Sequence, residues 1–240
     1  MAKYARSAQM RPLKLETLKS LTVRQDSQSV SAAAKTLSLS FASDPLIRWL
    51  NRNPNGPGWE SLETALQQWQ EARVREYAVR GIGMEAVTGD ENPISLGVCF
   101  LFPPKSQYRW LNPLWWPAHL RVLWDQYWVK PSEPFADQKR VETMMDTHYA
   151  SAKQIESRYP PNSLYYLEIA AVRPDTQGMG VGGSIMRWVI DQLGDSPCFL
   201  ECTNEKNIGF YEKYGFKLVD EKKLMDTTSP TSTTFYYMVR

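Results

Sequence analysis

The chain of 240 residues is 42% hydrophobic, which is enough to bury the core of one large domain or two small ones and excludes disorder as its main state. Twenty-eight Lys and Arg against 26 Asp and Glu leave a net charge of +2, so no strong overall field attracts nucleic acid or an anionic membrane. Three cysteines are too few for a disulfide framework, and no His/Cys cluster has the spacing of a zinc site. We therefore expect a cytoplasmic protein, monomer or homodimer, that uses no metal, nucleic acid or membrane.

The first 20 residues are rich in Lys and Arg and predict a basic arm. Residues 21–240 are then expected to form a single domain with an insert at 103–135. Apolar periodicity and Gly/Pro punctuation predict strands at 21–24, 83–88, 94–102, 164–172, 198–203, 216–224 and 235–239. The same signals predict helices at 27–39, 61–80, 180–193 and 207–214, a helix that begins after Asp137 and ends before Pro160, and a Ser/Thr-rich turn at 227–234.

The insert holds five of the nine tryptophans, punctuated by six prolines that prevent any long regular element. These tryptophans are Trp110, Trp115, Trp116, Trp124 and Trp128. We interpret the segment as an aromatic loop or lid with one short helix at 119–128, in which Trp110, Trp115 and Trp116 contact substrate. Ordinary packing of a long insert and a dimer surface are the alternatives.

A glycine-rich turn follows the predicted strand at 164–172 and leads into a helix. Four glycines between Gly178 and Gly183 let backbone N–H groups and the positive end of a helix dipole meet at one spot, which is an arrangement that binds phosphate. A tight turn alone is the alternative. Gly178, Gly180 and Gly183 also match a dinucleotide fingerprint with Glu201 downstream, but too little chain follows Glu201 for a doubly wound nucleotide domain.

Two motifs resemble those of one family. The stretch from Gln177 to Gly182 (QGMGVG) resembles the acetyl-coenzyme A signature Q/R-x-x-G-x-G/A of the GNAT N-acetyltransferase superfamily, and the stretch from Asn207 to Phe216 (NIGFYEKYGF) resembles its second motif. The resemblance covers residues 164–224. Residues 41–49 (FASDPLIRW) add a general resemblance to the puromycin-type, fungal small-molecule acetyltransferases.

This resemblance implies an α/β fold whose mixed, mostly antiparallel sheet splays between its fourth and fifth strands, with helices on both faces. Acetyl-coenzyme A would enter the opening: its pantetheine arm would pair with strand backbone, the glycine turn would hold the pyrophosphate, and a backbone N–H would stabilise the oxyanion. The implied cofactor-binding residues are Ala170, Ala171, Val172, Gln177, Gly178, Met179, Gly180, Val181, Gly182, Gly183, Asn207 and Tyr211.

Two side chains are catalytic candidates. Glu168 is the only charged residue between Leu164 and Val172, and strand alternation places it on the face of Tyr166, Ala170 and Val172. A desolvated carboxylate there can take a proton from an ammonium, directly or through water; a structural Glu bonded to backbone or Arg is the alternative. Tyr211 occupies the family position that protonates the departing thiolate, with packing under the cofactor as its alternative, and Tyr166 is a candidate for lining the acceptor pocket.

The remaining candidates are weaker. His148 lies on the apolar face of its predicted helix, which favours a core role, whereas His119 lies in the insert and either touches substrate or is exposed. Cys198 and Cys202 suit a buried strand better than nucleophilic catalysis, because no activating base is adjacent in sequence.

The function that fits these residues is acetyl transfer from acetyl-coenzyme A to the amine of a small molecule, by direct attack on the thioester. Two alternatives remain open: acetylation of a protein lysine or N-terminus, and a non-catalytic coenzyme A-binding module.

Overall fold

The computed structural model describes residues 18–22, 26–50, 59–88, 94–108, 111–124, 136–226 and 231–240. Its strands are β1 (Leu18–Thr22), β2 (Ile82–Thr88), β3 (Ser95–Phe102), β4 (Tyr165–Val172), β5 (Cys198–Cys202), β6 (Lys217–Met225) and β7 (Ser232–Val239). Its α-helices are α1 (Ser27–Phe41), α2 (Pro45–Leu50), α3 (Trp59–Arg80), α4 (Trp116–Trp124), α5 (Gln138–Glu156), α6 (Val181–Leu193) and α7 (Ile208–Glu212).

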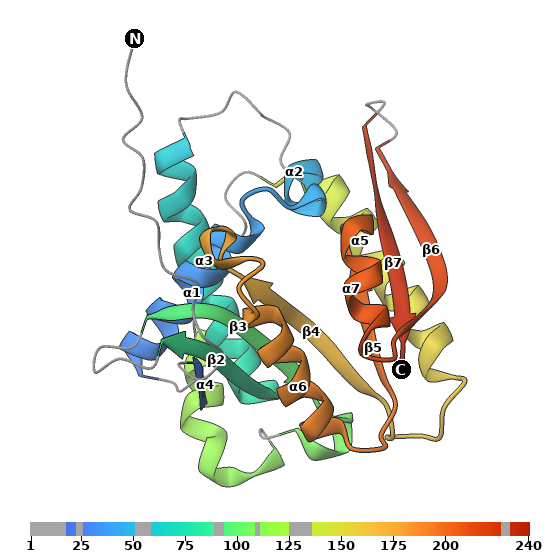
Figure 1. The fold of residues 1–240 in the computed structure, drawn as a ribbon, viewed down its shortest axis with the longest axis horizontal. Helices are drawn as coiled ribbons and strands as arrows, with labels where there is room; N and C mark the ends of the chain where they lie inside the picture. Colours follow the sequence, from blue (N-terminus) through green and yellow to red (C-terminus); the bar gives the residue numbers. More distant parts are fainter. Residues whose placement is uncertain are drawn as a thin grey trace.

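In the described part of the chain, the strands form one seven-stranded sheet in the order β1-β2-β3-β4-β5-β7-β6. Neighbouring strands are antiparallel except β4 and β5, which are parallel. These two pair only from Tyr165 with Cys198 to Leu167 with Leu200, and then they diverge, as Figure 1 shows. The predicted splay between the fourth and fifth strands is therefore confirmed.

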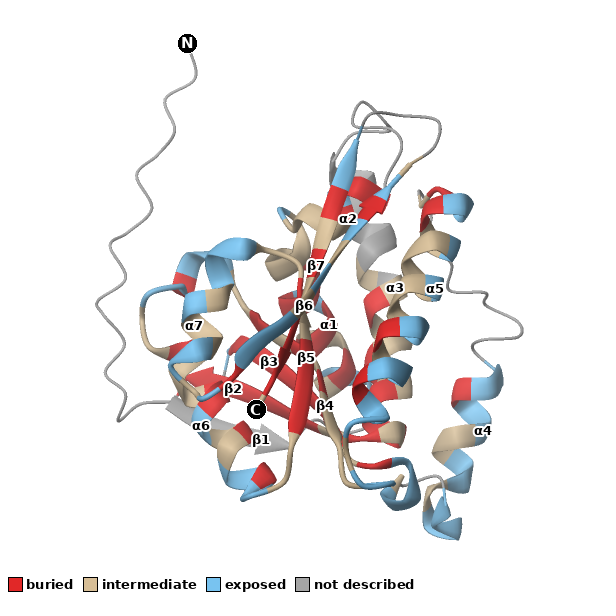
Figure 2. Ribbon diagram, turned by 90° about the vertical axis from the view of Figure 1, so that its right-hand side faces the viewer, coloured by how far each residue is buried: buried red, intermediate tan, exposed pale blue. Residues whose placement is uncertain are grey.

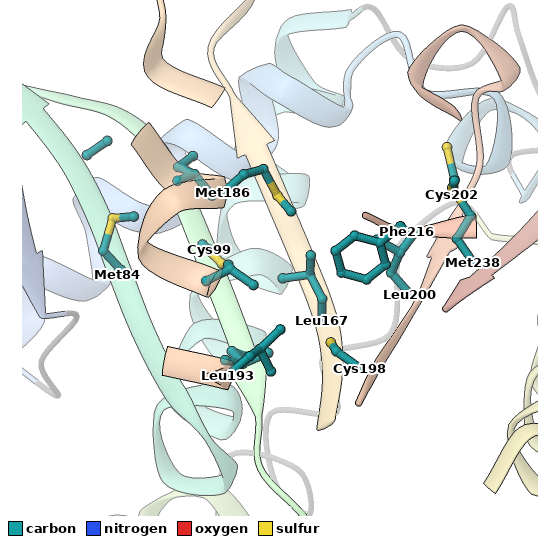
Figure 3. Packing of buried hydrophobic residues seen from close by; sticks show 14 of the residues in the cluster. Met84, Cys99, Leu167, Met186, Leu193, Cys198, Leu200, Cys202, Phe216 and Met238 are labelled. Atoms are coloured by element: carbon teal, nitrogen blue, oxygen red, sulfur yellow. The ribbon is translucent and has the colours of Figure 1, made fainter. Parts of the chain in front are cut away.

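Helices cover both faces of the sheet, which confirms the predicted layers. On one face, α6 packs its apolar side onto β2 to β5, with residues of α7 against the same cluster; Figure 3 shows side chains of β4, β5 and α6 meeting there. On the opposite face, α1 and α3 cover β3 and β4, while α2 and α5 cover β5 and β7. Figure 2 shows the buried strands between these layers. The opening between β4 and β5 thus has α6 and α7 on one side and α3 and α5 on the other.

One buried ion pair fixes α5 in this arrangement. Arg140 bonds Asp226 at the end of β6, with 2.7 Å between Nη2 and Oδ2, and both side chains are nearly buried. The guanidinium also donates to the carbonyl of Trp49 at the end of α2 and to the hydroxyl of Thr231 beside β7. A single cation therefore joins α5, α2 and the distal ends of the last two strands.

Several boundaries differ from the sequence-based ones. The first strand begins at Leu18, inside the segment expected to be the basic arm, and residues 1–17 lie outside the described residues. The short helix of the insert runs over Trp116–Trp124 rather than 119–128. The last strand begins at Ser232, inside the expected turn, because β6 continues to Met225 and pairs with it there. Helix α2 was not predicted; Asp44 caps it by accepting from the N–H groups of Leu46 and Ile47.

Candidate active site

A β-bulge at Glu168 sets the direction of this carboxylate. Phe100 of β3 pairs with Ile169 and the adjacent Leu101 pairs with Leu167, so Glu168 has no partner across the ladder. The extra residue breaks strict alternation. Glu168 shares the α3 side of the sheet with Tyr166, as predicted, but Ala170 and Val172 pack with the cluster under α6. The predicted shared face of Glu168 with Ala170 and Val172 is therefore wrong, because alternation cannot foresee a bulge.

The glycine-rich turn lies at the end of β4. After the short 3-10 helix Pro174–Thr176, Gly178 and Gly180 have φ angles of 79° and 88°, which an L side chain rarely adopts. Gly180 is the N-cap of α6, a helix of 13 residues whose first N–H groups have no intrahelical acceptors. Gln177 and Gly178 are exposed. The turn therefore offers backbone donors and the positive end of a helix dipole to an anion at the surface.

The β5 side of the opening carries Asn207 and Tyr211. Asn207 precedes α7 and is exposed, whereas the ring of Tyr211 packs edge-on against Phe210 and Phe216. Burial, followed by the nearby Cys202 and Cys99 thiols, raises the pKa of the Tyr211 phenol. The phenol therefore keeps its proton at physiological pH, which a donor to a leaving group requires.

A cavity of about 1880 Å³ joins the opening to the opposite layer of helices. The described residues that line it include Ala170, Asn207 and Tyr211 from the cofactor side, and residues of α2, α3, α5, β4 and β5 from the other side. The insert contributes Pro103, Pro104, Lys105, Tyr108 and Val122. The cavity is thus continuous from the predicted cofactor residues to the side chains around Glu168.

Glu168 is held by two side chains of α3. Tyr77 donates its hydroxyl hydrogen to Glu168 Oε1 at 2.7 Å, and Arg73 Nη2 lies 3.7 Å from the same oxygen. Arg73 Nε also donates to the Tyr77 hydroxyl at 2.8 Å. The carboxylate is 18% exposed, so it is partly desolvated and still reaches the cavity. This network contains the Arg contact that the sequence reading offered as the alternative role of Glu168.

A second carboxylate lies on the same side of the opening. Glu201 of β5 accepts from the Tyr166 hydroxyl at 3.2 Å, and its other oxygen lies 2.7 Å from His148 Nδ1. Burial lowers the pKa of His148, but the Glu201 hydrogen bond and the charges of Glu201 and Glu168 outweigh burial and raise that pKa above its ordinary value. The expected core role of His148 is wrong, since the imidazole is 22% exposed and lines the cavity.

The three cysteines behave as core residues rather than as acid–base groups. Cys99, Cys198 and Cys202 are buried free thiols. Burial raises the pKa of Cys198 to about 12 and that of Cys202 to about 11, which keeps these thiols protonated and un-nucleophilic. This agrees with their expected role as small apolar side chains.

The structure gathers some predicted residues and leaves others apart. Tyr166, Glu168, Ala170, Asn207 and Tyr211 line one cavity, whereas Trp115 and Trp116 are not among the residues that line it. Trp110 and Trp128 lie outside the described residues.

The sequence reading missed Arg73, Tyr77 and the partnership of His148 with Glu201. The four-residue spacing of Arg73 and Tyr77 places both on one face of α3. No sequence signal joins that face to β4, which is about ninety residues away along the chain.

The fold is a splayed α/β sheet whose opening has the glycine-rich turn and the N-terminus of α6 on one side, and carboxylates and a histidine on the other. Residues 140–218 match the family model described as "Acetyltransferase (GNAT) domain", so the chain is an acyltransferase that carries a domain of the GNAT family. No curated protein is significantly similar to the chain in sequence.

Crystal structures of GNAT proteins share the fold at low identity. Arylalkylamine N-acetyltransferase 2 from Aedes aegypti superposes with a TM-score of 0.56 at 12% identity, over 93% of this chain and 98% of that one. A structure described as histone acetyltransferase HPA2 and related acetyltransferase from Corynebacterium glutamicum gives 0.55 at 18% identity, over 92% and 95%. Polyamine N-acetyltransferase from Drosophila melanogaster gives 0.52 at 14% identity, over 92% and 99%. These matches address the fold, while the puromycin-type resemblance stays a prediction.

Within the described residues, no helix has the length and apolar character needed to cross a membrane. Nor does that part of the chain contain a group of three or more His, Cys, Asp or Glu side chains able to hold a metal ion.

Proposed function

We propose that the protein is an acetyl-coenzyme A-dependent N-acetyltransferase whose acceptor is the amine of a small molecule. The observation that carries this proposal is the cavity that connects Ala170, Asn207 and Tyr211 with the carboxylates of Glu168 and Glu201. Donor and acceptor sites on opposite faces of one opening are what direct transfer between two bound molecules requires.

The residues of the chain fit coenzyme A. Beyond Leu167, β4 has β3 as a partner on one side but no longer pairs with β5, so the backbone of Ala170 to Val172 faces the opening. A pantetheine arm can pair with that edge. We place the pyrophosphate at the N–H groups from Gln177 to Gly183, among which that of Met179 also donates to the Thr176 carbonyl, and Asn207 lies before α7 on the β5 side of the opening. When bound, acetyl-coenzyme A supplies the acyl group as an activated thioester.

Glu168, Tyr211 and the β4 backbone are assigned the acceptor binding, proton transfers and oxyanion stabilisation. The negative charge of Glu168 attracts an acceptor's ammonium, and Glu168 is the sequence-based candidate for its base, directly or through water. Tyr211, which lines the cavity, is the sequence-based candidate that donates its proton to the departing thiolate. A backbone N–H of β4 at the bulge stabilises the developing oxyanion.

The walls of the acceptor side favour a small amine. Trp69, Tyr77, Phe102, Tyr108 and Tyr166 surround the carboxylates with aromatic surface. Aromatic faces and carboxylates together bind an ammonium that carries an apolar or aromatic body. The arylalkylamine and polyamine N-acetyltransferases with the same fold add support from their described activities. A protein lysine remains a second outcome of the test, since the Corynebacterium structure is described as a histone acetyltransferase and relative.

The test is incubation with acetyl-coenzyme A and a panel of arylalkylamines, polyamines and lysine peptides, with release of free thiol as the readout. We expect turnover with a small amine. Tyr211→Phe is expected to lower kcat by about 100-fold at unchanged cofactor affinity. Glu168→Gln is expected to raise KM for the acceptor and also to lower kcat if Glu168 is the base.

Several results would contradict the proposal. Turnover confined to peptides would replace it with protein acetylation, and tight cofactor binding without any turnover would replace it with a binding module. Wild-type rates in both variants would remove the two assigned roles.

A further inference from the structure

His148 and Glu201 form an oriented pair outside the GNAT sequence motifs. Glu201 fixes the Nδ1 side of the imidazole at 2.7 Å, and the Tyr166 hydroxyl holds the other oxygen of Glu201 at 3.2 Å. The Nε2 atom of His148 has no hydrogen-bond partner among the described residues, and the ring lines the cavity. A carboxylate that binds one ring nitrogen fixes the tautomer and leaves the other nitrogen free to exchange a proton.

The pair lies where the two central strands separate. The parallel register ends with Leu167 opposite Leu200, so Glu168 and Glu201 are the next residues on the two diverging strands. Tyr166 packs against His148 with 5.7 Å between ring centroids and stacks on Phe199 at 4.4 Å. An amine held by Glu168 in this opening therefore has the His148 ring on the neighbouring wall.

The charges around His148 come from every layer packed on it. Glu201 of β5 and Glu168 of β4 favour the protonated ring, whereas Arg80 of α3 opposes it. The Tyr166 phenol of β4 and the Tyr149 ring of α5 are neutral neighbours. The balance raises the pKa of His148 above its ordinary value, so the neutral ring is a stronger base than a free imidazole.

We propose that His148 is the catalytic base that takes the proton of the acceptor's ammonium, with Glu201 as the positioning residue that holds its ring. This assignment rests on the acetyltransferase function proposed above and leaves Glu168 to bind the ammonium. It also gives the segment between β3 and β4 a chemical role, because α5 carries His148.

The step balances in protons and electrons. The ammonium gives one proton to Nε2 of neutral His148, which leaves a free amine and a protonated imidazole beside the Glu201 carboxylate. The nitrogen lone pair forms the new C–N bond, and the C–S bond breaks with its electron pair on sulfur. Sulfur takes a proton from Tyr211, and the second proton that nitrogen loses as the amide forms returns to the Tyr211 oxygen, directly or through water. One proton is released overall, from His148 to solvent.

Comparing two acceptors distinguishes a role of His148 in removing the ammonium proton from a role in binding or structure. An arylalkylamine is an ammonium at neutral pH and needs a base, whereas an aromatic amine is already neutral there. We expect His148→Gln to lower kcat/KM for the arylalkylamine by about 100-fold and for the aromatic amine by less than about threefold, because general-base catalysis contributes about 10²–10⁴-fold. Wild-type kcat/KM for the arylalkylamine should rise with pH through the His148 pKa, and Glu201→Gln should move that rise to lower pH.

Asp146→Asn is the matched control, since Asp146 is an exposed residue of the same helix that does not line the cavity. Equal losses for both acceptors in His148→Gln, or a selective loss only in Glu168→Gln, would overturn the assignment while the acetyltransferase function stands. No turnover by the wild type with any amine would overturn that function and the assignment together. An NMR titration of His148 that is unchanged by Glu201→Gln would overturn the positioning role of Glu201.

Discussion

The cofactor side and the acceptor side of the opening are built in different ways. The cofactor side uses backbone: the unpaired edge of β4, the turn at Gly178 and Gly180, and the N-terminus of α6, all within about twenty consecutive residues. The acceptor side uses side chains from α3, α5, β4 and β5, which lie up to about 130 residues apart in sequence. The first therefore has a local sequence signature, and the second depends on the whole fold.

This difference predicts that mutations far from the opening affect the acceptor side more than the cofactor side. Backbone donors keep their positions as long as the turn keeps its conformation. Side-chain pairs between layers require each helix to dock correctly, so the acceptor side is sensitive to contacts far from the chemistry.

The largest expected effect is on the docking of α5. Asp226→Ala leaves the buried Arg140 guanidinium without its carboxylate, and breaking a buried pair costs about 3–5 kcal/mol. The matched control is Asp175→Ala, which removes the more exposed Arg173–Asp175 pair beside the glycine turn and should cost less than about 1 kcal/mol. Denaturant unfolding measures both, and equal losses would contradict the contrast between buried and exposed pairs.

The next largest effect is on cofactor affinity and leaves the acceptor side intact. Gly180→Val places a β-branched residue at a φ of 88° in the turn, and we expect acetyl-coenzyme A to bind about 100-fold more weakly, or about 2.7 kcal/mol. Gly194→Val introduces strain of a related kind, at a φ of 54°, at the other end of α6 and should leave the affinity unchanged. Isothermal titration measures both. Normal affinity in Gly180→Val would remove the anion site from the turn.

The smallest effect concerns the acceptor side and pH. Because the folded-state pKa of His148 is raised, the pair's stabilisation is fully present below the unfolded pKa of about 6.5 and is lost as pH rises through the folded pKa. His148→Gln should therefore cost about 1–2 kcal/mol near pH 5.5 and less near pH 9. Unfolding free energies at the two pH values measure this. A larger cost at high pH would contradict the raised pKa.

The fold and the cofactor side of the site could be predicted from the sequence, whereas the contacts of the acceptor side could not. Gly178 and Gly180 have positive φ angles that few other residues tolerate, so their spacing encodes a backbone shape. The splay followed from the same motifs. Tyr77 and Arg73 could not be linked to Glu168, because their contact depends on how α3 crosses β4. His148 was predicted to be a core residue because it lies on the apolar face of its helix. Its role depends on Glu201, which only the fold brings within hydrogen-bond distance.

The bulge on β4 accommodates the Glu168 carboxylate without changing the alternation of the other residues of the strand. Without Glu168, the residues from Tyr165 to Val172 alternate regularly between the two faces, and each has its place in the ladder with β3 or in the core. The carboxylate is thus an insertion between two core positions rather than a replacement of either one. The bulge therefore places a polar group at the centre of the sheet while the residues on either side of it, Leu167 and Ile169, stay in the core.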